Sequence, residues 1–191
     1  MGSLLSSENS PLRELFQQRE RDYLLSGVKV SMRSPVENIE VGDLKIEKLR
    51  EGEIAELPRW VAEEFAGLGL AEVAEEPFET EILKSLSREK MIGAFQLSSL
   101  APDFYLRMKR RLAYLHEAAG AGRVRKEDYE RLRASSYDLI GIRLGKLLSL
   151  SSSSTTLSAI ADKLTPEEKV FFASSQSLSK EWKTLLLGEK A

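Results

Sequence analysis

The stretch SYDLIGIRLGKLLSLSS, residues 136–152, is the segment that says most about the fold of this chain. It continues a helical pattern that starts near Lys126. A helix that is apolar on two faces is expected to be buried on two sides. In a chain of 191 residues the second side could be covered by another subunit. The apolar positions spread over more than one face are Leu132, Leu139, Ile140, Leu144, Leu147 and Leu148.

Helical patterns also flank this segment. Residues 78–97 read as one helix, and residues 101–120 as another with Pro102 in its first position. In the second, Phe104, Met108, Leu112 and Leu115 recur one turn apart.

Residues 165–188 begin with Thr165, Pro166 and Glu168, the pattern of a capping box. Phe171, Phe172 and Trp182 would close a bundle or reach a partner. Helices of this length with short connections predict a helical bundle.

The first part of the chain has a different period. Between residues 27 and 58, apolar residues alternate in short runs separated by Gly-Asp and Glu-Gly pairs, which predicts short strands joined by tight turns. In LREGEIAELPRWVAEEF, residues 49–65, a strand leads through Pro58 into a helix. We expect Trp60 and Phe65 to pack that helix onto the small sheet. Residues 70–75 read as one more strand.

The predicted fold is therefore α+β, a small β-rich module followed by an α-helical bundle. Three segments are expected. Residues 1–26 form an N-terminal extension with a short helix, in which Leu12, Leu15 and Phe16 share a face. Residues 27–76 form the β-rich domain, and residues 77–191 form the helical domain.

The composition excludes several classes of protein. The chain has no cysteine and a single histidine, His116, so disulfides, thiolate metal sites and a histidine-built zinc site are not expected. No apolar run reaches the ~18 residues that a membrane helix needs, and the start does not resemble a signal peptide. These features predict a soluble, cytoplasmic protein. Two asparagines among many Glu, Lys and Arg residues are typical of proteins from heat-loving organisms.

A search for catalytic groups gives no constellation. The run from Gly141 to Leu147 resembles a phosphate-binding loop, but the glycines are one residue too close and Leu147 replaces the Ser or Thr that binds magnesium. Small residues where helices cross are the better interpretation. His116 is expected on the exposed side of its helix rather than as a catalytic base. We therefore expect no enzyme activity, no metal and no cofactor.

Charge is distributed unevenly along the chain. Residues 51–85 contain ten acids and two bases, whereas residues 100–150 contain eleven bases and six acids. The basic residues could neutralise DNA phosphates, could dock an acidic partner, or could form a solvated helix face. A sequence-nonspecific nucleic-acid-binding protein is thus an alternative function. The candidate cations are Arg107, Lys109, Arg110, Arg111, Arg123 and Arg125.

Three quoted stretches together resemble one known family. LREGEIAELPRWVAEEF, then DLIGIRLGKLL within residues 138–148, then LTPEEKVFF at residues 164–172, are similar in order and spacing to a subunit of the GINS complex. The type that it resembles is archaeal, with the small B domain before the helical A domain, the counterpart of the eukaryotic second and third partner subunits. The resemblance covers roughly residues 27–187, and residues 1–26 fall outside it.

The resemblance implies a non-enzymatic DNA replication factor. It implies a tetramer with a paralogous GINS subunit or with further copies of the same chain. It also implies contact with the MCM replicative helicase, with a RecJ-like or Cdc-type replication partner, and in some lineages with primase or polymerase. We expect bundle-core or subunit-interface roles for Phe104, Met108, Leu112, Leu115, Ile140, Leu144, Leu147, Phe171 and Phe172.

Overall fold

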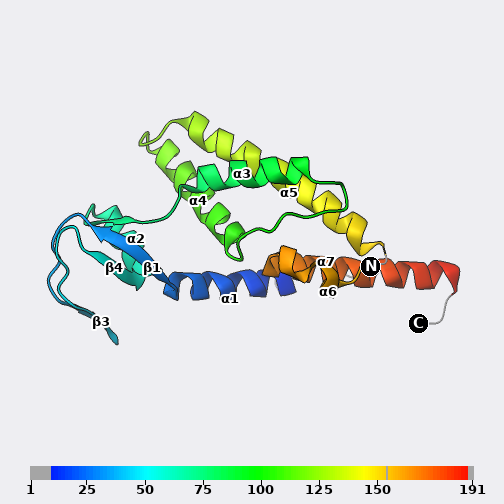
Figure 1. Ribbon diagram of the computed structural model, residues 1–191, viewed down its shortest axis with the longest axis horizontal. Coiled ribbons are helices and arrows are strands. Elements are labelled where there is room, and N and C mark those ends of the chain that lie inside the picture. The colour runs from blue at the N-terminus through cyan, green and yellow to red at the C-terminus, as the bar shows by residue number, and fades with distance from the viewer. Residues whose placement is uncertain (1–9, 154, 189–191) are drawn as a thin grey trace, which may run out of the picture. The chain divides into compact units, whose positions relative to one another are not determined.

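The computed structural model describes residues 10–153 and 155–188. Contacts within the chain divide it into two units: residues 17–76, and residues 77–191 together with the residues up to Phe16. The first helix, α1 (Pro11–Leu25), has residues in both units. The predicted α+β class is confirmed, with small sheets in the N-terminal half and helices in the C-terminal half (Figure 1).

The β-rich unit is built around one central strand. β1 (Gly27–Met32) pairs antiparallel with β4 (Ile54–Pro58) on one side and with β5 (Ala71–Val73) on the other. β2 (Ile39–Val41) and β3 (Leu44–Ile46) form a separate two-stranded hairpin. Its turn contains Gly42, whose φ of 60° lies in the left-handed region that glycine adopts easily. The predicted strands of this segment are therefore present.

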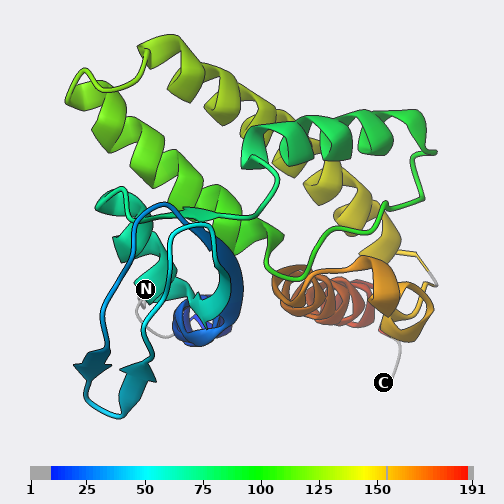
Figure 2. The same ribbon diagram turned by 60° about the vertical axis from the view of Figure 1, so that its left-hand side comes forward.

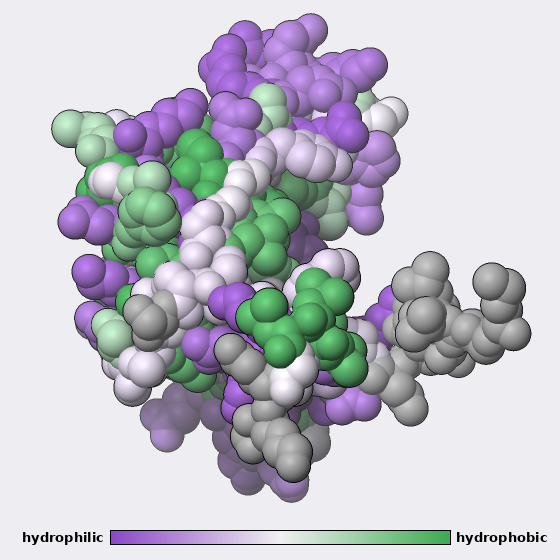
Figure 3. All heavy atoms as spheres, turned by 90° about the vertical axis from the view of Figure 1, so that its right-hand side faces the viewer, coloured by the Kyte–Doolittle hydropathy of each residue, from purple (hydrophilic) through white to green (hydrophobic). Residues whose placement is uncertain are grey.

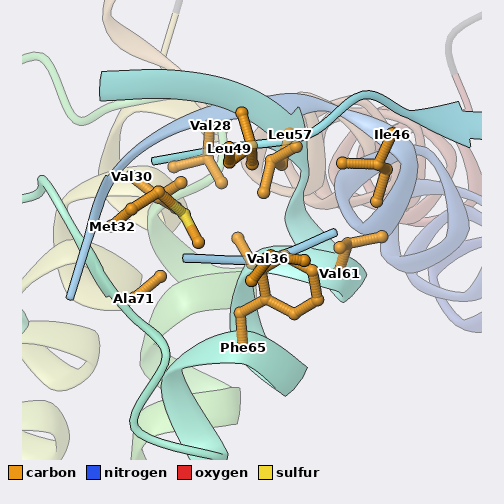
Figure 4. Close-up of a cluster of buried hydrophobic side chains, with 11 residues drawn as sticks. Val28, Val30, Met32, Val36, Ile46, Leu49, Leu57, Val61, Phe65 and Ala71 are labelled. Carbon is orange, nitrogen blue, oxygen red and sulfur yellow. The ribbon is translucent and has the colours of Figure 1, made fainter. Parts of the chain in front are cut away.

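Helix α2 (Arg59–Gly67) begins directly after β4, as the sequence predicts. The alternating residues of β1 point to one face, where Val28, Val30 and Met32 are buried. Figure 4 shows Val61 and Phe65 of α2 turned toward these strand residues. Phe65 is buried in this cluster and Trp60 is half-buried against it.

The described part of the helical unit contains four long helices after residue 77: α3 (Phe78–Met91), α4 (Phe104–Gly120), α5 (Lys126–Ser151) and α7 (Pro166–Leu187). A short helix, α6 (Leu157–Ile160), and a single 3-10 turn lie between α5 and α7. α5 is the central element, since α3, α4 and α7 all pack against it. Figure 2 shows α4 and α5 as an antiparallel pair, with α3 crossing α5. Buried apolar side chains join the four helices, including Ile82, Phe104, Leu139 and Phe172.

Two predicted helix boundaries are wrong. The helix predicted over residues 78–97 ends at Met91, because the chain becomes extended at Ile92 and turns at Gly93. Pro102 is not the first residue of α4; it lies in the preceding turn, and Asp103 holds the N-cap position. By contrast, Thr165 caps α7 in the predicted capping box, with Pro166 first and Glu168 third in the helix.

Candidate interaction surface and buried polar core

An apolar stripe runs along the exposed side of α5. Ile140, Leu144 and Leu148 are 39%, 41% and 46% exposed, and Tyr137 is 66% exposed. Their spacing places them on one face of the helix. The opposite face of α5 is buried in the bundle through Leu132, Leu139, Leu147 and Leu150. Contiguous exposed apolar side chains on a folded protein mark interaction surfaces, so this stripe is the leading candidate.

The α5 stripe adjoins an apolar cavity of about 370 Å³. Side chains from α4, α5 and α7 line it, together with two from the first turns of α1. Apolar groups dominate its accessible surface, although charged residues lie in its lining. The lining residues are Leu12, Phe16, Tyr105, Met108, Lys109, Ile140, Arg143, Leu144, Leu147, Glu167, Glu168 and Phe171.

A second apolar surface lies at the end of α7. Leu178, Trp182 and Leu185 follow one another at helical spacing and are 66%, 65% and 75% exposed. Leu186 and Leu187 are exposed beside them. Figure 3 looks onto this end of the helix and shows hydrophobic side chains at the surface. The first half of α7, in contrast, packs against α5 and buries Phe172.

Beneath the cavity lies a buried ionic cluster centred on Arg143 of α5. Its guanidinium uses all five N–H donors: two on the Glu168 carboxylate, one on Glu89, and one each on the carbonyls of Ser98 and Lys163. The side chain of Arg143 is 1% exposed. A fully satisfied guanidinium of this kind ties α5 to α3, to α7 and to two connecting segments.

The carboxylates of the cluster are equally well satisfied. Glu89 of α3 accepts from the ammonium of Lys146 at 3.0 Å and from both the amide and hydroxyl of Ser98. Glu168 accepts from the hydroxyl of Tyr105 at 2.7 Å and from the amide of Thr165 at 3.0 Å. The cluster therefore contains two buried acids and two buried bases, and its formal charges cancel.

Burial and pairing act together on the pKa values of these groups. Burial alone would raise the pKa of Glu89, but hydrogen bonds from Ser98 and Lys146 and the charge on Arg143 hold it below its ordinary value. Burial also opposes the charge on Arg143, yet its bonds to Glu168 raise its pKa above the usual value. Burial and the charge on Glu168 raise the pKa of Tyr105. The pKa shifts of Glu89 and Arg143 favour the charged forms, which agrees with their mutual pairing.

Residues 75–186 match the Sld5 family, described as the helical bundle domain of GINS complex proteins. The match covers more than half of the chain. The chain belongs to the GINS family. GINS proteins are non-catalytic subunits of a DNA replication complex, and other GINS subunits are their partners. Among curated proteins, none is similar to this chain at a significant level.

The residues singled out in this GINS chain separate into two groups. Phe104, Met108, Leu115, Leu147 and Phe172 are buried between the helices, and Leu112 packs half-buried against them. Ile140 and Leu144 lie in the exposed stripe, and Phe171 is half-buried beside the cavity. The stripe and the bundle core are therefore carried by neighbouring positions of α5.

The glycines that resemble a phosphate loop are not at a helix crossing. An added Cβ at Gly141 or at Gly145 would meet no atom of a neighbouring element within 4 Å, so the interpretation as crossing residues is wrong. Both face open space on the exposed side of α5. Lys146 is buried and bonds to the carbonyl and carboxylate of Glu89, so it is not presented to a phosphate group.

Two of the six candidate DNA-contacting cations are in ion pairs between α3 and α4. Arg107 pairs with Glu81, and Arg111 with Glu79 at 2.7 Å. Arg125 pairs with Asp128 at 3.0 Å on the surface. Lys109 and Arg123 are exposed, and Arg110 is half-buried. The six cations are thus spread along α4 and the turn that follows it.

Within the described part of the chain, no group of acids and histidines could hold a metal ion. His116 is exposed, as predicted, and the centre of its ring lies 5.2 Å from the centre of the Tyr129 ring. No helix among the described residues is long and apolar enough to cross a membrane.

The sequence analysis missed the buried cluster and a smaller one in the β-rich unit. There Arg59 forms two hydrogen bonds with Glu75, and its guanidinium lies 4.2 Å from the centre of the Tyr23 ring. A usable signal exists for Arg143 and Lys146. They lie one turn apart on the face of α5 that carries Leu139, Leu147 and Leu150, and a charged residue on a buried face needs a buried partner.

Proposed function

We propose that this chain is a GINS subunit that scaffolds the MCM replicative helicase and activates unwinding without catalysing a reaction itself. Membership of the GINS family supports the role in replication. The observation that carries the scaffold role is the α5 stripe, an exposed apolar surface on the most central helix of the bundle.

The proposed assembly is a tetramer in which the α5 stripe is covered by another GINS subunit. Interfaces of obligate complexes are more apolar than ordinary surfaces and dominated by a few large side chains. The exposed end of α7, with Trp182, is the second proposed contact. We infer the archaeal type with the small domain first, since the β-rich unit precedes the helical match at residues 75–186. The asparagine-poor composition supports a heat-adapted source.

The further partners are proposed to be MCM, a RecJ-like or Cdc-type factor, and primase or polymerase. Because residues 51–76 of the β-rich unit contain eight acids and one base, this unit is the proposed docking module for a basic partner surface. Trp60 and Phe65 would act there only by holding α2 on the sheet. Such a protein would work at replication forks in the cytoplasm, near the nucleoid.

The experiment that tests this function replaces Ile140 and Leu144 with aspartate. The chain is co-expressed with a paralogous GINS subunit and the mass of the complex is measured by light scattering. Because both side chains are about 40% exposed in the isolated chain, the double variant should fold normally yet assemble at least about 100-fold more weakly. Stimulation of MCM unwinding should be lost with assembly.

The matched control is Leu83→Asp on α3, a leucine that is 51% exposed outside the stripe. It should assemble and stimulate MCM like the wild type. A wild-type chain that remains monomeric with its paralogue, or a double variant that assembles normally, would contradict the scaffold role of α5. Trp182 offers an independent readout, since its fluorescence should shift to shorter wavelength when the end of α7 is covered.

A further inference from the structure

The first turns of α1 form one wall of the cavity beside the α5 stripe. Leu12 and Phe16, one turn apart, line it together with Ile140 and Leu144. Leu12, Leu15 and Phe16 are all half-buried, whereas Leu25 at the other end of the same helix is 69% exposed. The apolar residues at the start of α1 are therefore partly covered, although the buried residue of this helix, Tyr23, lies nearer its other end.

This wall does not belong to the matched bundle. The GINS helical bundle begins at residue 75, and α1 lies ahead of it in the chain, on the far side of the β-rich unit in sequence. The residues up to Phe16 nevertheless group by contacts with the helical unit. A segment from outside the bundle thus lies against part of the face that another subunit is proposed to cover.

We propose that residues 11–16 are an intramolecular cap on the α5 face, and that the cap is displaced when another GINS subunit binds there. The second half of this inference rests on the proposed function, because it requires α5 to be an interface. The cap lines the cavity beside Ile140 and Leu144, which it covers only in part, since they remain 39% and 41% exposed. It leaves Leu148 and Tyr137, which do not line the cavity, open to an incoming subunit.

The cap is built to be weak. It contributes only Leu12 and Phe16 to the lining of the cavity, about 370 Å³ of which remains open. An incoming subunit that covers the whole stripe would bury more apolar surface than the cap does. A cap that is closed most of the time lowers the apparent affinity for that subunit by the fraction of open chains. We expect that removing the cap strengthens assembly by about tenfold.

The first experiment tests the cap without any partner. The chain has no cysteine, so Leu144→Cys introduces a single thiol. Its rate of reaction with a maleimide should rise about twofold when Leu12→Asp and Phe16→Asp are added, because the exposure of position 144 is then no longer limited to 41%. Leu25→Asp is the matched control and should not change the rate. Equal rates in all three chains would overturn the cap.

A second thiol position keeps this result from being confused with unfolding. Leu148→Cys lies on the same stripe but outside the cavity. Its rate should be unaffected by Leu12→Asp and Phe16→Asp if only the cap opens. A parallel rise at Leu148→Cys would show general loosening of α5 and would overturn the inference.

The second experiment tests displacement. Leu12→Cys and Leu144→Cys are joined by a short bismaleimide crosslinker, and assembly with the paralogous GINS subunit is compared with that of the uncrosslinked double variant. Crosslinked chains should assemble at least about tenfold more weakly. Equal assembly would overturn displacement. Failure of the uncrosslinked chain and the wild type to assemble would contradict the proposed function instead, and the thiol rates would still decide whether the cap exists.

Discussion

Arg143 of α5 and Glu168 of α7, 25 residues apart in the chain, are joined by two parallel hydrogen bonds from one guanidinium to one carboxylate. Both side chains are at least 95% buried. The pair links the central helix to the start of the last one, where Glu168 also completes the capping box with Thr165. One residue thus serves both the local start of α7 and the packing of the bundle.

Replacing Arg143 should be strongly destabilising. Arg143→Ala leaves the carboxylates of Glu89 and Glu168 buried without their main counter-charge, and breaking a buried pair in this way costs about 3–5 kcal/mol. Arg143→Lys should be nearly as harmful, since an ammonium has three donors and cannot reach four separate acceptor groups. Urea unfolding followed by circular dichroism measures both. Arg133→Ala, an exposed arginine on the same helix, should cost less than about 1 kcal/mol.

The helical unit should lose stability in acid partly through Glu89. Its pKa is lowered in the folded state, so its contribution is fully present above the ordinary carboxyl pKa of about 4.3 and is lost as the pH falls through the lower folded value. Glu89→Gln should be less stable at neutral pH but should lose less stability between pH ~5 and ~3. Chemical unfolding at a series of pH values measures this. The exposed Glu117→Gln should follow the wild-type curve, and an unchanged slope in Glu89→Gln would refute the prediction.

The N-cap residue of α7, Thr165, should stabilise the protein through its side-chain hydroxyl. This oxygen accepts from the amide of Glu168, and the side chain is 1% exposed. Thr165→Ala should lower the free energy of unfolding by about 1 kcal/mol. Thr165→Ser keeps the oxygen and should recover most of that loss. If the serine and alanine variants were equally unstable, the loss of stability would come from the missing methyl group and not from the N-cap hydrogen bond.

The cations of α4 and the following turn should differ in their contribution to DNA binding. The double variant Arg123→Glu, Arg125→Glu should weaken retention on DNA, because it removes contacts with phosphates. Each lost contact should reduce the slope of the logarithm of the binding constant against the logarithm of the salt concentration by about 0.9. Arg107 and Arg111 join α4 to α3 through Glu81 and Glu79, so their reversal should mainly destabilise that contact, whereas the pair of Arg125 with Asp128 lies on the surface and joins no helices. Filter binding across a salt series separates the two. An unchanged slope in the first variant would identify these arginines as a solvated face.

Much of the fold was predictable, because it depends on local patterns. The alternation of Val28, Val30 and Met32 predicted β1, and Thr165 with Glu168 predicted the start of α7. The end of α3 was not predictable in this way. The chain leaves the helix after Met91, and Ser98 returns to bond with Glu89, a residue nine positions earlier that is itself fixed by Lys146 from α5. Such pairings depend on tertiary contacts that leave no periodic signal in the sequence.

The sequence predicts that α5 carries an apolar surface, but not which residues of the helix form it. The two apolar faces of α5 are visible in its spacing, but which face is buried depends on where α3, α4 and α7 pack. Of the exposed apolar residues at the end of α7, the sequence analysis singled out only Trp182. The wall formed by Leu12 and Phe16 could not be foreseen, because it joins residues more than 120 positions apart in the chain.

The open surroundings of Gly141 and Gly145 have a consequence for the dynamics of α5. Glycine within a helix lowers stability by roughly 0.5–1 kcal/mol relative to alanine. No neighbouring atom in this chain would clash with a side chain at Gly141 or Gly145. The middle of the helix therefore has low intrinsic helix propensity on the side that faces solvent. In the isolated chain, backbone amides near these glycines should exchange hydrogen faster than those around Leu132. Covering that side with another helix would slow the exchange, so the segment proposed for assembly is also the one whose local stability should change most when assembly occurs.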